Sequence, residues 1–317
     1  MKTLFIVGNG FDIKHKLPTK YIDFKNYLIA KKYCVDNDED VNVDTYQNKE
    51  GDVDVSEDTS GNLLIKCIND LAYSKSTDKE RIDCLEWKDF ENYLGMLSFD
   101  NQEPFREWYV DENDDDSEFK YMHVIEDKKA DVFTAASKWK ELFAEWVHSI
   151  PYTKEYIKLK KKRRISRILR KDDCKVLSFN YTLTIEEKYL FKKVCHIHGD
   201  IGQDIFIFGH EKKDCDHDND DYISFSEINS NISRYYEKPV EEQYKKYLSF
   251  FNEVGSDTNH IYSFGFSFSD VDLFYIKKII DKLSDNCTWH INKYKKTEVD
   301  AKKTLMSLGF KGKVKFY

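Results

Sequence analysis

Short apolar segments alternate with segments of helical periodicity over the second half of the sequence, and this alternation limits the fold more than any other feature. The apolar segments have the length of strands, and helical spacing of apolar residues separates most of them. The expected strands cover residues 175–180, 193–199, 205–209, 260–265, 287–293 and 313–316. The expected helices cover residues 181–190, 240–252, 270–283 and 298–308. Strands that alternate with helices are typical of a mainly parallel sheet with helical crossovers.

The N-terminal residues add one more strand and a tight turn to this pattern. Residues 4–7 are bulky and partly β-branched, which suits a strand that is covered on both faces of a parallel sheet. Gly8 and Gly10 follow, and glycine permits a close approach of the backbone to a ligand such as a phosphate. Ile13 replaces the third glycine of the dinucleotide-binding fingerprint, so an ordinary turn remains an alternative. Helical spacing of apolar residues then predicts a helix over residues 20–32.

A long block of different character separates this first unit from the other strands. Helical periodicity recurs at residues 63–71, 85–94 and 132–148. We therefore predict an α/β protein with a Rossmann-like, mainly parallel sheet and a large helical insertion after the first βα unit. The nucleotide-binding core comprises residues 1–34 and 166–317, and the insertion comprises residues 35–165.

Composition and cysteine usage exclude several classes of protein. The seven cysteines are scattered and form no Cys-x-x-Cys pair, which argues against a zinc ribbon and a disulfide framework and favours a reducing compartment. The N-terminus lacks the pattern of a signal peptide, and no apolar run approaches the length of a membrane span. A net charge of −8 argues against indiscriminate binding of polyanions, although a local basic site remains compatible with it. We expect a cytoplasmic protein with no membrane partner.

Charged segments are interpreted mainly as solvated surface. The acidic runs at 36–40 and 111–116 are expected to be exposed loops, with cation binding as the alternative for the second run. A mixed set of ligand types between His210 and Asp218 matches no closed zinc site, so no metal is expected. The basic stretch 158–171 is predicted to form an amphipathic surface helix that buries Ile165, Ile168 and Leu169, and contact with nucleic-acid phosphates is the alternative.

Polar and glycine residues follow the predicted strands where ordinary buried strands would simply turn. Ligands of open α/β sheets bind outside the carboxyl ends of the strands, so these residues are expected to share one rim. The rim segments are 8–10, 180–182, 196–199, 209–210 and 265–272.

Several motifs, taken together and in order, resemble one family over nearly the whole chain. The motifs are Val7-Gly8-Asn9-Gly10-Phe11-Asp12, Leu17-Pro18-Thr19 with Tyr21, Trp87-x-x-Phe90-Glu91-x-x-Leu94-Gly95, Phe179-Asn180-Tyr181-Thr182-x-Thr184-x-Glu186, His196-Ile197-His198-Gly199, Phe208-Gly209-His210 and Gly265-Phe266-Ser267-x-x-Asp270-x-Asp272. The pattern resembles the AbiH family of bacteriophage abortive-infection proteins, which is in turn similar to sirtuin-like NAD-binding defence proteins.

This resemblance implies an NAD site and roles for its residues. Gly8 and Gly10 would hold the pyrophosphate, Asn180 the nicotinamide ribose or a water, and His198 would be the catalytic base. Thr182 stands where sirtuin-like NAD hydrolases commonly have aspartate, and the four-cysteine zinc module of the deacetylases is absent, which counts against deacetylation.

The residue types also suit the cleavage of a ribosyl–nicotinamide bond independently of the family. A neutral imidazole with a pKa near ~6.5 can accept a proton at physiological pH, and an asparagine amide both donates and accepts hydrogen bonds. Asp12 is expected to accept from a ribose hydroxyl, to orient an imidazole or merely to cap the turn. Since side chains alternate along a strand, His196 is expected on the same face as His198.

We therefore expect an anti-phage effector that binds and hydrolyses NAD, with His198 and Asn180 as catalytic residues. The residues expected to bind NAD are Gly8, Asn9, Gly10, Phe11, Asp12, Tyr181, Thr182, Gly199, Gly265 and Ser267. The alternatives are a module that senses NAD or ADP-ribose without turnover and signals to a partner, and an effector directed at RNA or DNA through the basic helix. A homo-oligomer and a phage-derived trigger are further expected partners.

Overall fold

The computed structural model describes residues 2–32, 45–49, 53–97, 129–151, 154–171, 173–212, 223–293 and 298–317. The chain forms two compact units, which we call the sheet unit and the helical unit. The sheet unit contains Met1–Thr19, Val147–Ile207 and Pro239–Tyr317, and the helical unit contains Lys20–Trp146 and Phe208–Lys238. The acidic runs at 36–40 and 111–116 and the segment 213–222 lie outside the described residues.

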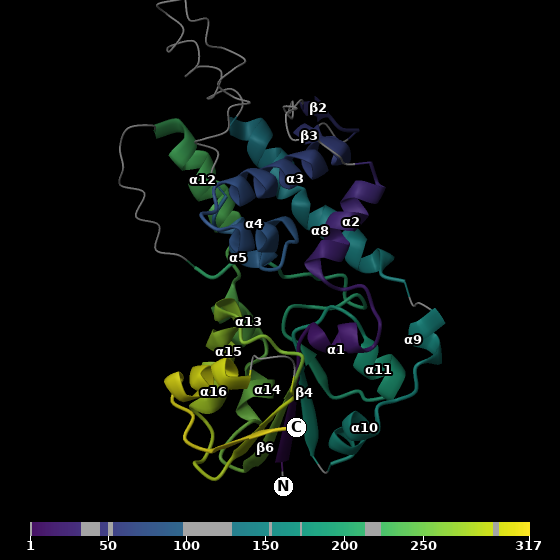
Figure 1. Cartoon of the computed structure of the whole chain (residues 1–317), viewed down its shortest axis with the longest axis vertical. Coiled ribbons are helices and arrows are strands. Elements are labelled where there is room, and N and C mark those ends of the chain that lie inside the picture. Colours follow the sequence, from purple (N-terminus) through teal and green to yellow (C-terminus); the bar gives the residue numbers. More distant parts are fainter. Residues whose placement is uncertain are drawn as a thin grey trace, which may run out of the picture. The chain divides into compact units, whose positions relative to one another are not determined.

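A six-stranded parallel sheet is the centre of the sheet unit (Figure 1). Its strands are β1 (Lys2–Val7), β4 (Cys174–Ser178), β5 (Val194–His196), β6 (Thr258–Phe264), β7 (Thr288–Ile291) and β8 (Lys313–Phe316). Their order is β5-β4-β1-β6-β7-β8, so the chain builds outward from β1 in one direction, returns to β6 beside β1 and then builds in the other direction. The parallel sheet predicted from the alternating pattern is confirmed.

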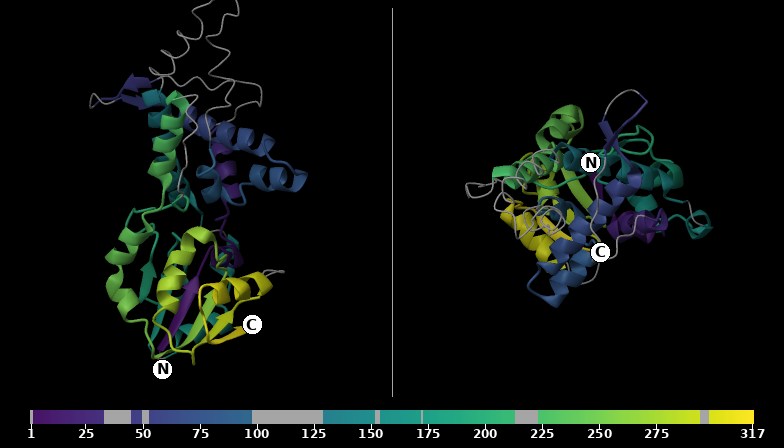
Figure 2. Two further views of the ribbon diagram at one scale, coloured as in Figure 1. Left: turned by 90° about the vertical axis from the view of Figure 1, so that its left-hand side faces the viewer. Right: turned by 90° about the horizontal axis from the view of Figure 1, so that it is seen from above.

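Helices cover both faces of this sheet. On one side lie α1 (Gly10–Lys14), α10 (Arg163–Leu169) and α11 (Thr184–Tyr189), and on the other lie α13 (Val240–Lys246), α14 (Leu248–Asn252), α15 (Asp270–Ile280) and α16 (Glu298–Ser307) (Figure 1). In the left view of Figure 2 the strands run behind the green and yellow helices of the second group. The short helix α9 (Lys154–Lys158) precedes α10.

The central strand β1 shows why the sheet is buried on both faces. Leu4 and Ile6 belong to the apolar cluster under α15 and α16, whereas Phe5 and Val7 belong to the cluster under α10 and α11. All four side chains are at most 1 % exposed. The amphipathic pattern predicted for the basic stretch is confirmed in α10, because Ile165, Ile168 and Leu169 are buried in the second cluster.

Strand register brings the carboxyl ends of four strands to one edge. Val7, the last residue of β1, lies opposite Ser178 of β4 and Phe264 of β6, and Ser178 lies opposite His196 of β5. The segments that follow these four residues therefore form a common rim, as predicted.

The helical unit has a core of aromatic side chains. Its elements are α2 (Tyr21–Ala30), the hairpin of β2 (Thr45–Gln47) and β3 (Val53–Val55), α3 (Glu57–Tyr73), α4 (Asp78–Leu85), α5 (Phe90–Leu94), α12 (Ile223–Tyr236) and most of α8 (Trp139–Ser149). Phe24 packs against Trp87, Phe90 and Phe143 with ring centroids 5.4–5.7 Å apart. The periodicity of apolar residues that predicted helices in this block reflects this packing.

Two local predictions differ from the structure. Residues 205–209 belong to no strand, and the predicted helix 240–252 is divided into α13 and α14. The helical unit also contains two segments that lie outside the predicted insertion 35–165. These segments are α2 and residues 208–238. The physical reason is side-chain packing: Phe24 and Phe208 each contact Phe143.

Candidate functional site

The turns after β1 and β6 pack against each other through glycine. The Gly8 N–H donates to Phe264 O at 3.2 Å, and the Gly10 N–H donates to Gly265 O at 2.9 Å. A Cβ at Gly8 would lie 2.7 Å from Gly265 O, and one at Gly10 would lie 2.6 Å from Gly265 Cα. Gly265 has φ +63°. These glycines are thus required for the close packing of the two turns, and their expected contact with a pyrophosphate stays a prediction.

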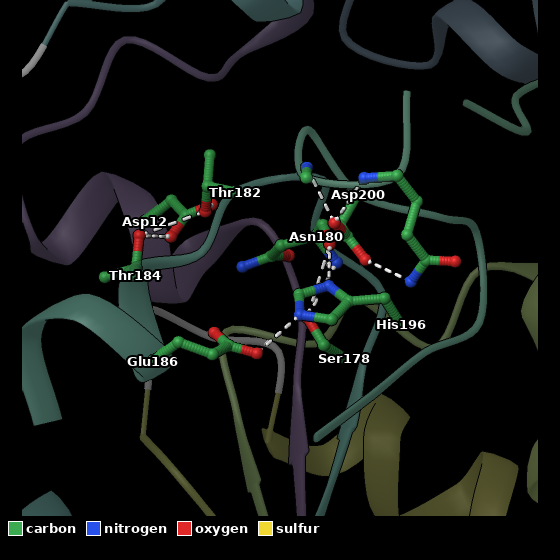
Figure 3. A network of polar contacts seen from close by, with 10 residues as sticks. Asp12, Ser178, Asn180, Thr182, Thr184, Glu186, His196 and Asp200 are labelled. Atoms are coloured by element: carbon green, nitrogen blue, oxygen red, sulfur yellow. Dashed lines mark hydrogen bonds and ion pairs between the residues drawn. The ribbon is translucent and has the colours of Figure 1, made fainter. Parts of the chain in front are cut away.

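Asp12 places a buried carboxylate at the rim. It follows the first turn in α1 and is 1 % exposed. Its oxygens accept from Thr182 Oγ1 at 2.6 Å and Thr184 Oγ1 at 2.8 Å (Figure 3). Burial raises the pKa of Asp12 to about 6, although both hydroxyls and the nearby His196 oppose this rise. Asp12 is therefore an anion at neutral pH that protonates in mild acid.

His196 is held between two oxygens that can only accept a hydrogen bond. Its Nδ1 lies 2.8 Å from the backbone oxygen of Asn180, and its Nε2 lies 2.9 Å from Glu186 Oε1 (Figure 3). Both nitrogens must donate to satisfy these contacts, which requires the imidazolium form. Burial lowers the pKa of His196, but the hydrogen bond and charge of Glu186 outweigh burial, so the pKa is raised. Glu186 thus favours the charged form of His196, and this charge in turn opposes the rise in the pKa of Asp12.

Two acceptor atoms in this region are buried without a hydrogen-bond partner among the described residues. They are the side-chain oxygen Oδ1 of Asn180 and the second carboxylate oxygen Oε2 of Glu186. The backbone of Asn180 is fixed, because its N–H donates to Ser178 Oγ at 3.2 Å and its oxygen binds His196. Buried acceptors normally find a donor, so the two atoms are ready to receive one from a ligand.

His198 forms a second and separate polar pair. It lies in the turn after β5 and is 3 % exposed, and its Nε2 is 3.2 Å from Asp272 Oδ1 of α15. The rings of Phe179 and Tyr275 flank it with centroids 5.4 and 6.2 Å away. The 3.2 Å contact is not a hydrogen bond, so Asp272 places a carboxylate beside the imidazole without fixing its tautomer.

The two histidines do not share one environment, although strand alternation predicted that they would. His196 contacts Glu186 of α11, whereas His198 contacts Asp272 of α15, and these helices cover different faces of the sheet. The reason is that β5 ends at His196 and residues 197–198 form a turn, so the alternation of side chains stops there.

Two of the expected binding residues have internal contacts. The amide of Asn9 donates to the backbone oxygen of Thr19 and accepts from the Thr19 hydroxyl, so it ties the first turn to the chain before α2. Phe11 is fully buried, and its ring packs on His15 and Phe264 with centroids 4.5 and 5.7 Å away. The side chain of Phe11 is therefore a core residue.

The remaining expected residues lie along the rim with different exposure. Tyr181 donates from its hydroxyl to Ile207 O at 2.9 Å, and Gly199 has φ +81° with Ile205 O pressed against the position of a Cβ. Ser267 is exposed. Gly209 and His210 belong to the helical unit, where the His210 imidazole faces the backbone oxygens of Glu211 and Ser233.

Four polar residues of the rim were not among the expected site residues. Thr184 and Glu186 belong to the motif of residues 179–186 that follows β4. Their place in this motif was the sequence signal that could have identified them as site residues. Asp200 accepts from the N–H groups of Gly202 and Gln203 at 2.7 and 3.1 Å and thereby closes the loop after His198. Asp272 belongs to the motif after β6, but its contact with His198 had no local signal, because the two residues are far apart in the sequence.

Searches for a metal centre and for a membrane span were confined to the described residues. In those ranges no group of three or more His, Cys, Asp or Glu side chains could hold a metal ion. The same part of the chain contains no helix with the length and apolar character needed to cross a membrane.

Comparison with known proteins gives one match. The family model described as bacteriophage abortive infection AbiH matches residues 4–293. No curated protein and no solved structure matches the chain. The matched range includes most of β1 and all of the rim from Asp12 to Asp272.

Proposed function

This chain belongs to the AbiH family of bacteriophage abortive-infection proteins, and on that premise we propose that it is an anti-phage effector that binds NAD at the rim of its sheet and hydrolyses it with release of nicotinamide. The proposal includes a Rossmann-like sheet and a relation to sirtuin-like NAD-binding proteins.

The observation that carries the proposal is the pair of buried acceptors, Asn180 Oδ1 and Glu186 Oε2, for which the described part of the chain provides no donor. An acceptor calls for a ligand that donates, and leaving such an atom unpaired costs about 1–3 kcal/mol. Ribose hydroxyls are donors of this kind. The carboxylate of Asp12, already bonded to Thr182 and Thr184, supplies negative charge in the same region and suits a sugar that becomes cationic.

The order of the strands supports a nucleotide ligand. Counted along the chain, the order β5-β4-β1-β6-β7-β8 corresponds to 3-2-1-4-5-6, which is the order of doubly wound dinucleotide-binding sheets. In such sheets the ligand lies outside the carboxyl ends of the strands, where the order reverses. Here that position is the end of β1 between β4 and β6, next to Gly8 and Gly265.

Hydrolysis would use the His198–Asp272 pair as the base. Water forms the new bond to C1′ of the ribose, and nicotinamide leaves with the electron pair of the broken C1′–N bond. The imidazole of His198, which has the Asp272 carboxylate beside it, accepts the proton that the water loses. Asn180 positions a ribose hydroxyl or the water, and the anionic Asp12 stabilises the positive charge that develops on the sugar.

Nicotinamide release tests the proposal. Purified protein is incubated with NAD in the presence and absence of lysate from phage-infected cells, and nicotinamide is quantified by chromatography. We expect release by the unaltered protein and a loss of about 100-fold or more in His198→Ala. The control is His148→Ala, whose exposed imidazole contacts Asp204 in the same unit. Absence of release under both conditions would refute hydrolysis, and equal release by His198→Ala would refute His198 as the base.

A sensor that binds NAD without turnover is the second candidate. It is favoured by the internal bonding of the rim, because Asp12 and His196 already have hydrogen-bond partners within the protein. A sensor predicts a rise in melting temperature with NAD and no product. Loss of this rise in Asn180→Ala would support binding at the rim, and formation of nicotinamide would exclude a pure sensor.

A further inference from the structure

One half of the sheet is incompletely covered on the side of α10 and α11. Phe5 and Val7 of β1 are fully buried there, but their register neighbours in β6, Tyr262 and Phe264, are only half-buried. The buried members of the apolar cluster on this side come from β1, β4, α1, α10 and α11 and include none from β6, β7 or β8. Among the described residues, cover on this face thus decreases from β1 toward β8.

Aromatic side chains occupy the uncovered part. Tyr262 of β6 and His290 of β7 are register neighbours, and their rings are parallel within 7° with centroids 4.3 Å apart. The ring centroids of His260 and His290 are 5.3 Å apart, and those of Tyr317 and Tyr262 are 5.9 Å apart. All four rings are half-buried, so each keeps part of its surface accessible.

Basic side chains surround these rings from two directions. From the side of α10, Lys171 lies over the Tyr262 ring at 4.8 Å and Arg164 lies over the Tyr317 ring at 4.7 Å. From the edge strand β8, Lys313 and Lys315 are exposed and lie opposite Thr288 and His290 in register. Eight residues thus form what we call the aromatic–basic face: Arg164, Lys171, His260, Tyr262, His290, Lys313, Lys315 and Tyr317.

The pKa values of the two histidines on this face are lowered in part by nearby lysine charges. Burial is the first cause that lowers the pKa of His260 and of His290, and the charges of Lys171 and Lys315 lower both further. The pKa of His290 falls to about 4. The positive charges of these two lysines therefore reach both imidazoles, although the chain carries a net charge of −8.

We propose that the aromatic–basic face binds single-stranded nucleic acid. Cations at its borders are placed to contact phosphates, and the half-exposed rings and the Arg164 guanidinium offer surfaces on which bases can stack. This combination of a basic border and aromatic side chains is how proteins bind single strands without sequence preference. The proposal is independent of the NAD site, which lies at the carboxyl ends of the strands.

A second copy of this chain is a poorer occupant of the same face. A two-fold symmetric interface brings identical patches together. Here it would bring two patches that carry Lys171, Lys313 and Lys315 together, and two surfaces of the same charge repel each other. Charge complementarity thus favours a polyanion.

Charge reversal on the edge strand tests the proposal. Fluorescence anisotropy is measured with labelled oligo(dT) and oligo(U) of about 20 nucleotides at about 50 mM salt. The test variant is Lys313→Glu with Lys315→Glu, and the matched control is Lys302→Glu with Lys303→Glu, two exposed residues of α16 on the other side of the sheet. We expect the test variant to weaken binding about tenfold or more and to reduce the salt slope, with little effect of the control.

A second variant examines the rings without changing charge. Tyr262→Leu keeps an apolar side chain beside the core and removes the stacked ring, so we expect weaker binding with an unchanged salt slope. Unchanged affinity in both the charge-reversed and the Tyr262→Leu protein would overturn the proposal, as would equal loss in the α16 control. A dimer in light scattering that only the Lys313 and Lys315 substitutions dissociate would identify a second copy as the occupant and also overturn it.

Discussion

His196 and His198 lie two residues apart on the same edge of the sheet, yet their surroundings differ in kind. Both ring nitrogens of His196 are committed to acceptors, the Asn180 carbonyl and Glu186. His198 has one carboxylate partner, Asp272, at Nε2, and its ring lies among aromatic side chains. His196 thus has a protein partner at each ring nitrogen, and its raised pKa favours the charged form. On the proposed function we expect an electrostatic and structural role for His196 and the chemical role for His198.

Exchange of each carboxylate partner for its amide gives the largest expected contrast. Asp272→Asn removes the negative charge beside His198, and we expect nicotinamide release to fall about 100-fold or more. Glu186→Gln leaves His198 unchanged and is expected to reduce release less than tenfold while lowering the free energy of unfolding by about 1–3 kcal/mol. Steady-state kinetics and urea unfolding of both variants measure the two effects. Equal losses of activity would remove the distinction between the two histidines.

The pH dependence of stability sharpens the electrostatic part of the comparison. Burial raises the pKa of Asp12 from 3.8 to about 6, so the folded protein binds its proton more tightly than the unfolded chain does. The resulting stabilisation is complete below pH 3.8 and is lost as the pH rises through about 6. It amounts to about 3 kcal/mol, because one pKa unit corresponds to about 1.4 kcal/mol.

Asp12→Asn tests this linkage. The amide does not titrate, so the difference in free energy of unfolding between the variant and the unaltered protein should change by about 2.4 kcal/mol between pH 4 and pH 7 in urea titrations. A constant difference over this range would show that the Asp12 carboxyl is not buried as described. His196 has a raised pKa as well, and its contribution is lost only at higher pH than that of a free imidazole.

Removal of one hydroxyl beside Asp12 has the smallest expected effect. Thr182→Val and Thr184→Val each take one hydrogen bond from the buried carboxylate and preserve side-chain volume. We expect each to lower the free energy of unfolding at pH 7 by about 1–2 kcal/mol and to raise the pKa of Asp12 further. Thermal unfolding of both variants measures the loss. An increase in stability would contradict the role of these threonines as donors to the carboxylate.

Much of the sheet was predictable from sequence because each element has a local signal. The apolar run of β1, the helical spacing in α15 and the final strand β8 were all identified, and adjacent strand ends followed from parallel pairing. The rim positions of Asp12 and Asn180 were predicted for the same reason. The segment 205–209 has the composition of a strand but no strand partner, so composition alone misled there.

The amino-acid sequence by itself determined the parallel α/β architecture, the position of the rim and the family, because strand length, helical period and the order of motifs are local properties. Only the tertiary structure decided which side chains act together. The turn at residues 197–198 places His198 beside Asp272, whereas His196 contacts Glu186. Strand register places Tyr262 beside His290 on the aromatic–basic face. These pairings join distant parts of the chain, and no local preference encodes them.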